Sequence, residues 1–191
     1  GTPSSYEVLL GEIPVKAAVR QSPHSPLLYC VPATIDLAGA EIELVSMVAR
    51  ENRLRNALAE LDEMDFDYVF IDCPPSLGLL TLNALVAAPE VLIPIQCEYY
   101  ALEGVSQLMK NIGMVKAHLN PRLDVSTVVL TMYDGRTKLA DQVASEVRRF
   151  FGDKVLNTVI PRSVKVSEAP GYGMTIIDYD PGSRGAMSYL D

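Results

Sequence analysis

The chain has 191 residues and a formal net charge of −8, with 49% hydrophobic and 21% charged residues. This balance is typical of a globular protein with a sizeable core, and it excludes an intrinsically disordered chain. No apolar run reaches the roughly 18 residues of a membrane span and the amino end shows no signal-peptide pattern, so we expect a cytoplasmic protein.

Helical patterns alternate with short apolar runs along the chain. The first pattern has the spacing of a capping box, Ser4-Ser5-Tyr6-Glu7, and Gly11 could end that short helix. Leu54, Leu58 and Leu61 mark a second helix, and three more are predicted over 76–88, 101–118 and 137–151. The apolar runs, each predicted to be a strand, are 27–31, 68–71, 91–95, 125–130 and 155–160.

This alternation of strands and helices predicts the fold class. Strands that alternate with helices form βαβ units, and runs that are continuously apolar indicate a sheet covered by helices on both faces. We see no internal repeat or linker. The sequence therefore predicts a single α/β domain over residues 1–191, with a mostly parallel sheet.

The three cysteines form no Cys-x-x-Cys pair. Cys30, Cys73 and Cys97 each lie in or just after an apolar run. We therefore predict buried, reduced thiols rather than a zinc site.

Asp72 ends the second apolar run and is followed by Pro74 and Pro75. In an open parallel sheet the ligand crevice lies beyond the carboxyl ends of the strands, so an acid there can reach a metal ion or its bound water. The two prolines fix two φ angles and stiffen the segment. An Asp that caps the next helix would give the same local pattern.

The usual partner of such an Asp is a phosphate-binding loop, Gly-x-x-x-x-Gly-Lys followed by Ser or Thr. None of the 12 glycines in this chain is followed by Lys. Because one carboxylate cannot position a γ-phosphate, we expect no ATP hydrolysis by this chain alone.

Charge is distributed unevenly along the sequence. Residues 1–130 contain 8 basic and 16 acidic side chains, whereas residues 131–191 contain 8 of each. Between Arg136 and Lys165 there are 7 basic residues and 3 acidic ones. This run predicts a local positive face, although an ordinary solvated helix face would carry the same residues.

Several strings, in their joint order and spacing, resemble the ParA/Soj family of chromosome- and plasmid-partitioning ATPases. That family is a branch of the deviant Walker-type P-loop proteins, which also contains MinD. The resemblance covers nearly the whole chain. The strings lie at 32–34, 37–44, the Asp72 segment, 95–104, 130–137, 160–162, 167–170, 179–181 and 183–186.

The resemblance implies a P-loop NTPase-like fold that is incomplete at its N-terminus. The family pattern has upstream strands with a Lys-Gly-Gly-x-Gly-Lys-Thr loop and an Asp-rich first switch. At about 30 residues per βα unit, we expect roughly a hundred further residues upstream of this chain. The sequence also departs from the family at Ser163, where Asn is common, and at Met174, where Lys is frequent.

The resemblance also implies roles for particular residues, with ATP and Mg²⁺ as cofactors of the complete protein. Asp72 would be catalytic and would orient the magnesium ion and the attacking water. Met132, Pro161 and Arg162 match positions that bind the adenine base, although they could simply end two strands.

Arg136 and Lys165 match positions at which relatives contact DNA. The implied cycle has three steps. ATP closes a homodimer, the dimer binds DNA without sequence preference, and a ParB/Spo0J-type partner stimulates hydrolysis. We therefore expect a cytoplasmic, nucleoid-associated protein that does not bind membranes.

Three other functions remain open at this stage. A non-enzymatic module would bind DNA or a partner without nucleotide. A MinD-like membrane-cycling ATPase would need a basic amphipathic helix at the carboxyl terminus, but residues 183–191 hold Arg184 alone and end in Asp191. A ligase or amidotransferase would need a substrate pocket with its own acids and bases, and the sequence shows no such cluster.

Overall fold

The computed structural model describes residues 3–74 and 76–191. They form two compact units, one of Gly1–Pro89 with Asn111–Leu123 and the other of Glu90–Lys110 with Asp124–Asp191. The long helix α6, Ala101–His118, contributes residues to both units. A single domain over residues 1–191 stays a prediction.

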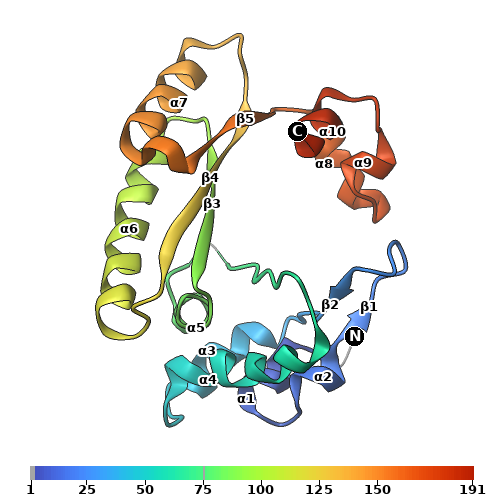
Figure 1. The fold of residues 1–191 in the computed structure, drawn as a ribbon, viewed down its shortest axis with the longest axis vertical. Coiled ribbons are helices and arrows are strands. Elements are labelled where there is room, and N and C mark those ends of the chain that lie inside the picture. The colour runs from blue at the N-terminus through green and yellow to red at the C-terminus, as the bar shows by residue number, and fades with distance from the viewer. Residues whose placement is uncertain (1–2, 75) are drawn as a thin grey trace. The chain divides into compact units, whose positions relative to one another are not determined.

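The first unit is mainly helical. Its apolar core gathers around Val8, Val15, Ala18 and Leu61, each of which is buried. Its two short strands are β1 (Arg20–Gln21) and β2 (Tyr29–Cys30). The helices are α1 (Ser5–Leu10), α2 (Val15–Ala18), α3 (Leu37–Leu44), the 3₁₀ helix η1 (Arg50–Asn52), α4 (Arg53–Leu58), the 3₁₀ helix η2 (Ala59–Met64) and α5 (Leu79–Ala87) (Figure 1).

The predicted capping box begins α1. The side chain of Ser4 accepts a hydrogen bond from the backbone of this first turn, and the Ser4 backbone N–H donates to Glu7 Oε2 at 2.8 Å. Gly11 ends the helix with φ of 77°, a left-handed conformation that glycine adopts without strain. Both ends of this helix were therefore predicted correctly.

Two of the five predicted strands are absent from the parallel sheet. Residues 66–74 form neither helix nor strand, and Phe70 is 83% exposed. In the run 27–31 only Tyr29–Cys30 is a strand, and it pairs antiparallel with Arg20–Gln21. A strand needs a neighbour for its backbone N–H and C=O groups, and neither run pairs with the described parallel strands. For these two runs the expectation of parallel strands was wrong.

The second unit contains the parallel sheet, in the strand order β3-β4-β5. Its strands are β3 (Glu90–Gln96), β4 (Asp124–Tyr133) and β5 (Val155–Pro161), close to the predicted runs. Helix α7 packs against β4 and β5 (Figure 1). The helices are α7 (Lys138–Phe151), the 3₁₀ helix η3 (Gly152–Lys154), α8 (Val164–Glu168), the 3₁₀ helix η4 (Ala169–Tyr172), α9 (Ile176–Tyr179) and α10 (Arg184–Leu190).

The register of the sheet places apolar side chains on one buried face. Ile93 is paired with Val128, and Ile95 is paired with Leu130. All four are buried, whereas Leu92, one position along β3, is 49% exposed. Helix α7 supplies its own buried stripe, Ala140, Val143, Ala144, Val147 and Phe151. The apolar spacing of the sequence predicted Leu139, Val143, Val147 and Phe150 instead, and it was right for the two valines only, because Leu139 and Phe150 are exposed.

Only one of the three cysteines is buried as predicted. Cys97, which directly follows β3, is buried, whereas Cys30 and Cys73 are exposed. Cys30 lies in, and Cys73 just after, the two runs that do not join the parallel sheet. Within the described residues, no helix is both long enough and apolar enough to cross a membrane.

Candidate functional site

The carboxyl ends of β4 and β5 bring together the residues predicted to bind a nucleotide base. Tyr133 is paired with Pro161 across the sheet, so that Met132 and Arg162 lie beside this pair. Met132 and Pro161 are half-buried, and Arg162 is exposed. The three predicted residues thus form one surface at the edge of the sheet where parallel α/β folds bind ligands.

Met132 has a left-handed backbone conformation, with φ of 53°. A residue with a side chain pays on the order of 1–3 kcal/mol for such a conformation, and residues of this kind cluster at functional sites. Hydrogen bonds on either side fix it: Cys97 N donates to Thr131 O, and Arg162 N donates to Tyr133 O, each at 2.9 Å. The strain marks the Met132 position as a candidate ligand contact.

Arg162 forms an ion pair with Glu98, which comes just after β3. The two outer strands of the sheet are therefore joined beyond the end of the middle strand, β4. Both side chains are about half exposed, so the ion pair itself adds little stability. Sequence reasoning missed this partner, although the position of Glu98 at the end of a predicted strand could have indicated it.

Arg136, one of the two predicted DNA contacts, lies in the turn after β4 and is held by Asp134. Its Nε and NH2 donate to the two Asp134 carboxylate oxygens at 2.9 and 2.7 Å. This hydrogen bonding holds the pKa of Asp134 well below its usual range and raises the pKa of Arg136. The Arg136 side chain is 88% exposed, so it faces solvent while it is paired.

Lys165, the other predicted DNA contact, is on α8. Its Nζ lies 3.4 Å from Glu168 Oε2 and 5.5 Å from the centre of the Tyr179 ring. The hydrogen bond and charge of Glu168 raise the pKa of Lys165, so it is cationic at neutral pH.

The predicted positive face is therefore largely neutralised by local ion pairs. Residues 136–165 all lie in the described part of the chain, and five of their seven basic side chains pair with a carboxylate. The pairs are Arg136–Asp134, Arg149–Glu146, Lys154–Asp124, Arg162–Glu98 and Lys165–Glu168.

Asp72 belongs to the first unit, whereas the other predicted site residues belong to the second. It is exposed and lies in a segment without helix or strand. Helix α5 begins at Leu79 with Gly78 at the N-cap position, so Asp72 does not cap it. The helix-cap alternative for Asp72 is thereby wrong. Pro75, the second proline of the predicted turn, lies outside the described residues.

A single carboxylate suits magnesium better than calcium or zinc. Mg²⁺ usually keeps several waters and takes only one or two protein carboxylates together with substrate phosphates. The described residues contain no group of three or more His, Cys, Asp or Glu side chains that could hold a metal by themselves. An exposed carboxylate such as that of Asp72 is the kind of protein ligand that magnesium sites of this sort use.

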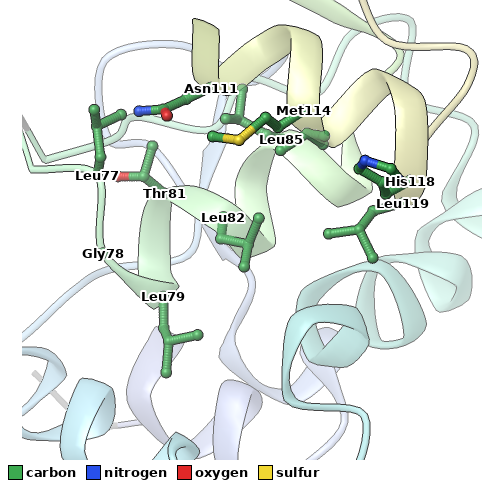
Figure 2. A pocket seen from close by; sticks show the side chains of 11 residues that line it. Leu77, Gly78, Leu79, Thr81, Leu82, Leu85, Asn111, Met114, His118 and Leu119 are labelled. Carbon is green, nitrogen blue, oxygen red and sulfur yellow. The ribbon is translucent and has the colours of Figure 1, made fainter. Parts of the chain in front are cut away.

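The first unit also contains an apolar pocket of about 550 Å³ between α5 and the end of α6 (Figure 2). Leucines dominate its lining, together with Met114 and Val115, and the polar side chains are Thr81, Asn111 and His118. The lining contains no Asp or Glu side chain.

The three parallel strands with flanking helices are the fold of P-loop nucleoside triphosphatases, an assignment that solved structures confirm. One of them is a cobyrinic acid a,c-diamide synthase from Mycobacterium smegmatis, solved with bound ADP and magnesium. It superposes on this chain with a TM-score of 0.81 and is 40% identical in sequence, and the match covers 98% of this chain and 68% of that chain. The cell division ATPase MinD of Pyrococcus furiosus, at 24% identity, has a TM-score of 0.76 over 99% of this chain and 73% of its own. MinD therefore supports the fold alone.

Sequence comparison then identifies the family. Residues 2–125 match the model of an AAA domain family. The sporulation initiation inhibitor protein Soj of Bacillus subtilis is 60% identical over 84% of this chain, and the chromosome-partitioning ATPase Soj of Treponema pallidum is 49% identical over 96%. The chain belongs to the ParA/Soj family of chromosome-partitioning ATPases, as its motifs predicted.

The chain spans only part of these relatives. It covers 63% of the Bacillus subtilis protein and 72% of the Treponema pallidum protein. It likewise covers 66% of the chromosome partitioning protein ParA of Myxococcus xanthus, to which it is 52% identical.

Proposed function

We propose that the complete protein is a DNA-partitioning ATPase, which binds ATP and Mg²⁺, forms a homodimer and holds DNA without sequence preference. A ParB/Spo0J-type protein would stimulate hydrolysis and so release the DNA. The observation that carries this proposal is the surface of Met132, Pro161 and Arg162 at the carboxyl edge of the sheet, in a chain whose relatives include a chromosome partitioning protein and a chromosome-partitioning ATPase. We expect this protein in the cytoplasm, on the nucleoid.

The base-binding surface suits adenine. An aromatic base is flat on both faces, and the half-buried Met132 and Pro161 offer an apolar surface for one of them. The Arg162 guanidinium is planar and stacks well on aromatic rings. Glu98 restrains this guanidinium through their ion pair, so that less side-chain freedom is lost when a base binds.

Asp72 would hold the magnesium ion, through its hydration shell, and would orient the attacking water. The ion would supply charge neutralisation at the phosphates, which together with positioning provides most of the catalysis of phosphoryl transfer. The exposure of Asp72 leaves its carboxylate accessible to such a ligand.

Arg136 and Lys165 would contact DNA phosphates. Both are exposed cations of the second unit, and contacts to phosphates carry no sequence information. A homodimer would present each of them twice, which doubles the electrostatic contribution.

The test is DNA binding by the complete protein with ATP and Mg²⁺, with ADP and without nucleotide, on two duplexes of unrelated sequence. We expect binding to both duplexes with ATP and little binding otherwise. Equal binding without nucleotide would identify a non-enzymatic DNA-binding module. ATP-dependent binding to anionic lipid vesicles, with none to DNA, would identify a MinD-like membrane-cycling ATPase.

A further inference from the structure

Lys165 is part of a small preorganised cluster of four side chains, Lys165, Glu168, Tyr172 and Tyr179, which we call the Lys165 cluster. Glu168 Oε2 lies 3.4 Å from Lys165 Nζ and accepts a hydrogen bond from the Tyr179 hydroxyl at 3.3 Å. The rings of Tyr179 and Tyr172 stack with their centres 5.1 Å apart. The carboxylate of Glu168 is therefore held in place beside the ammonium group.

A phosphate that approaches Lys165 meets this carboxylate as well. The Lys165 and Glu168 side chains are 52% and 42% exposed, so both are accessible to the same incoming anion. Phosphate and carboxylate carry the same sign of charge and seek the same donor, so they compete for it. Either the Lys165–Glu168 ion pair separates, or the phosphate binds next to a repelling charge.

We propose that Glu168 antagonises DNA binding: its carboxylate competes with a DNA phosphate for the Lys165 ammonium and thereby limits affinity. The inference rests on the proposed function, because it assumes that Lys165 contacts DNA. The proposed function names residues that strengthen DNA binding, and this inference names one that weakens DNA binding. An antagonist of this kind would keep the DNA complex reversible at physiological salt.

Asp134 holds Arg136 in a similar way, but it is the less informative residue to change. Its Oδ1 also accepts a hydrogen bond from the Arg136 backbone N–H at 3.1 Å. Substitution of Asp134 would therefore alter the turn as well as the charge. Glu168 makes its contacts with the Lys165 cluster through its side chain.

The experiment measures DNA affinity of the complete protein, with ATP and Mg²⁺, by fluorescence anisotropy at several salt concentrations. Glu168→Gln removes the charge and keeps an oxygen that can accept from Tyr179. The matched control is Glu63→Gln, which makes the same change of net charge in the first unit, where Glu63 is ion-paired with Lys16. Glu168→Gln is also measured in a Lys165→Ala background.

We expect Glu168→Gln to tighten DNA binding by up to about fivefold for each Lys165 contact, the range set by removal of an exposed ion pair. The salt dependence of DNA binding should become steeper. In the wild type, DNA binding releases a cation from the phosphate but frees the Glu168 carboxylate, which takes up a cation from solution. In Glu168→Gln no carboxylate is freed, so the net release of cations is larger. Glu63→Gln should change affinity much less, and the gain from Glu168→Gln should vanish in the Lys165→Ala background.

Several outcomes would overturn the inference. Unchanged binding by Glu168→Gln would show that Glu168 does not compete with DNA for Lys165, and weaker binding would show that Glu168 supports Lys165. An equal gain in Glu63→Gln would assign the effect to total charge. In both cases the proposed function would stand, provided that Lys165→Ala weakens binding. Absence of all DNA binding in the wild-type protein would instead overturn the proposed function together with this inference.

Discussion

The side-chain oxygen of Asn83 accepts a hydrogen bond from the backbone N–H of Leu54 at 3.1 Å, which ties α5 to the first turn of α4. Asn83 is fully buried, and its Nδ2 donates to the carbonyl oxygens of Arg50 and Leu79, each at 2.9 Å. Both hydrogens and the oxygen of this amide are therefore bonded to the backbone of the first unit.

Asn83→Ala should destabilise the protein by about 2–4 kcal/mol, because it leaves buried backbone groups without partners and creates a small cavity. Urea denaturation would measure the change in stability. Asn56→Ala, on the exposed side of α4, is the matched control and should change stability by less than about 0.5 kcal/mol. Equal effects of the two substitutions would contradict this account of Asn83.

Gly185 should not tolerate a side chain. A Cβ atom there would lie 2.5 Å from Val166 Cγ2 and 3.6 Å from Ile176 Cγ1, so α10 could no longer approach α8 and α9 as closely. Gly185→Ala should cost about 1–3 kcal/mol through overpacking. Gly182→Ala is the control, since nothing lies within 4 Å of its Cβ position. Thermal denaturation of both variants checks the prediction, and it is wrong if Gly185→Ala is as stable as Gly182→Ala.

In the complete protein, Asp72→Ala should lower the rate of ATP hydrolysis by about a hundredfold or more. ATP affinity should change far less, because the defect falls on metal and water placement in the transition state. Steady-state phosphate release and equilibrium nucleotide binding separate the two effects. Near wild-type turnover with unchanged magnesium dependence would remove Asp72 from the catalytic machinery.

Arg136→Ala and Lys165→Ala should each weaken DNA binding about equally on unrelated sequences. Each should also lower the slope of log affinity against log salt, by at most about 0.9 for every DNA phosphate that the protein no longer neutralises, or about 1.8 in a homodimer, and by less where the carboxylate that DNA displaces takes up a cation. Lys16→Ala, which removes a cation from the first unit, is the control and should leave the slope unchanged. Strong preference for one duplex, or unchanged slopes, would contradict a mechanism based on phosphate neutralisation.

The capping box of α1 makes a prediction about pH. Hydrogen bonds from Ser4 lower the pKa of Glu7 from its usual value of 4.5. A lowered folded-state pKa stabilises the protein above the unfolded-state pKa, and this contribution is lost as pH falls through the folded-state value. The stability difference between wild type and Glu7→Gln should therefore be constant near neutral pH and change below about pH 4.5. A difference that is the same at pH 7 and pH 3 would contradict this.

The sequence was most informative where local rules decide the structure. The spacing of Ser4 and Glu7 specified a helix start, and β3, β4 and β5 were recognisable because each is a continuous apolar run between helical patterns. The runs at 27–31 and 68–71 have the same local character. Whether such a run becomes a strand depends on a neighbouring strand, which a local pattern does not contain.

The sequence indicated which residues belong to the candidate site, but not how their side chains are arranged and paired. Motif positions indicated Met132, Pro161 and Arg162, and the sheet register brings them together. The carboxylates that hold Arg162 and Lys165 were not predicted. Glu98 is 64 positions away from Arg162 in sequence, and Glu168 has the spacing of an ordinary helix surface pair.

The conformation of Met132 has a mechanical consequence. The carbonyl groups on either side of it accept hydrogen bonds from opposite directions, one from Cys97 after β3 and one from Arg162 after β5. The segments that follow the two outer strands are thus fastened to a single strained residue of the middle strand. A displacement of either segment would therefore act on the backbone next to Met132, and the two segments are coupled through it.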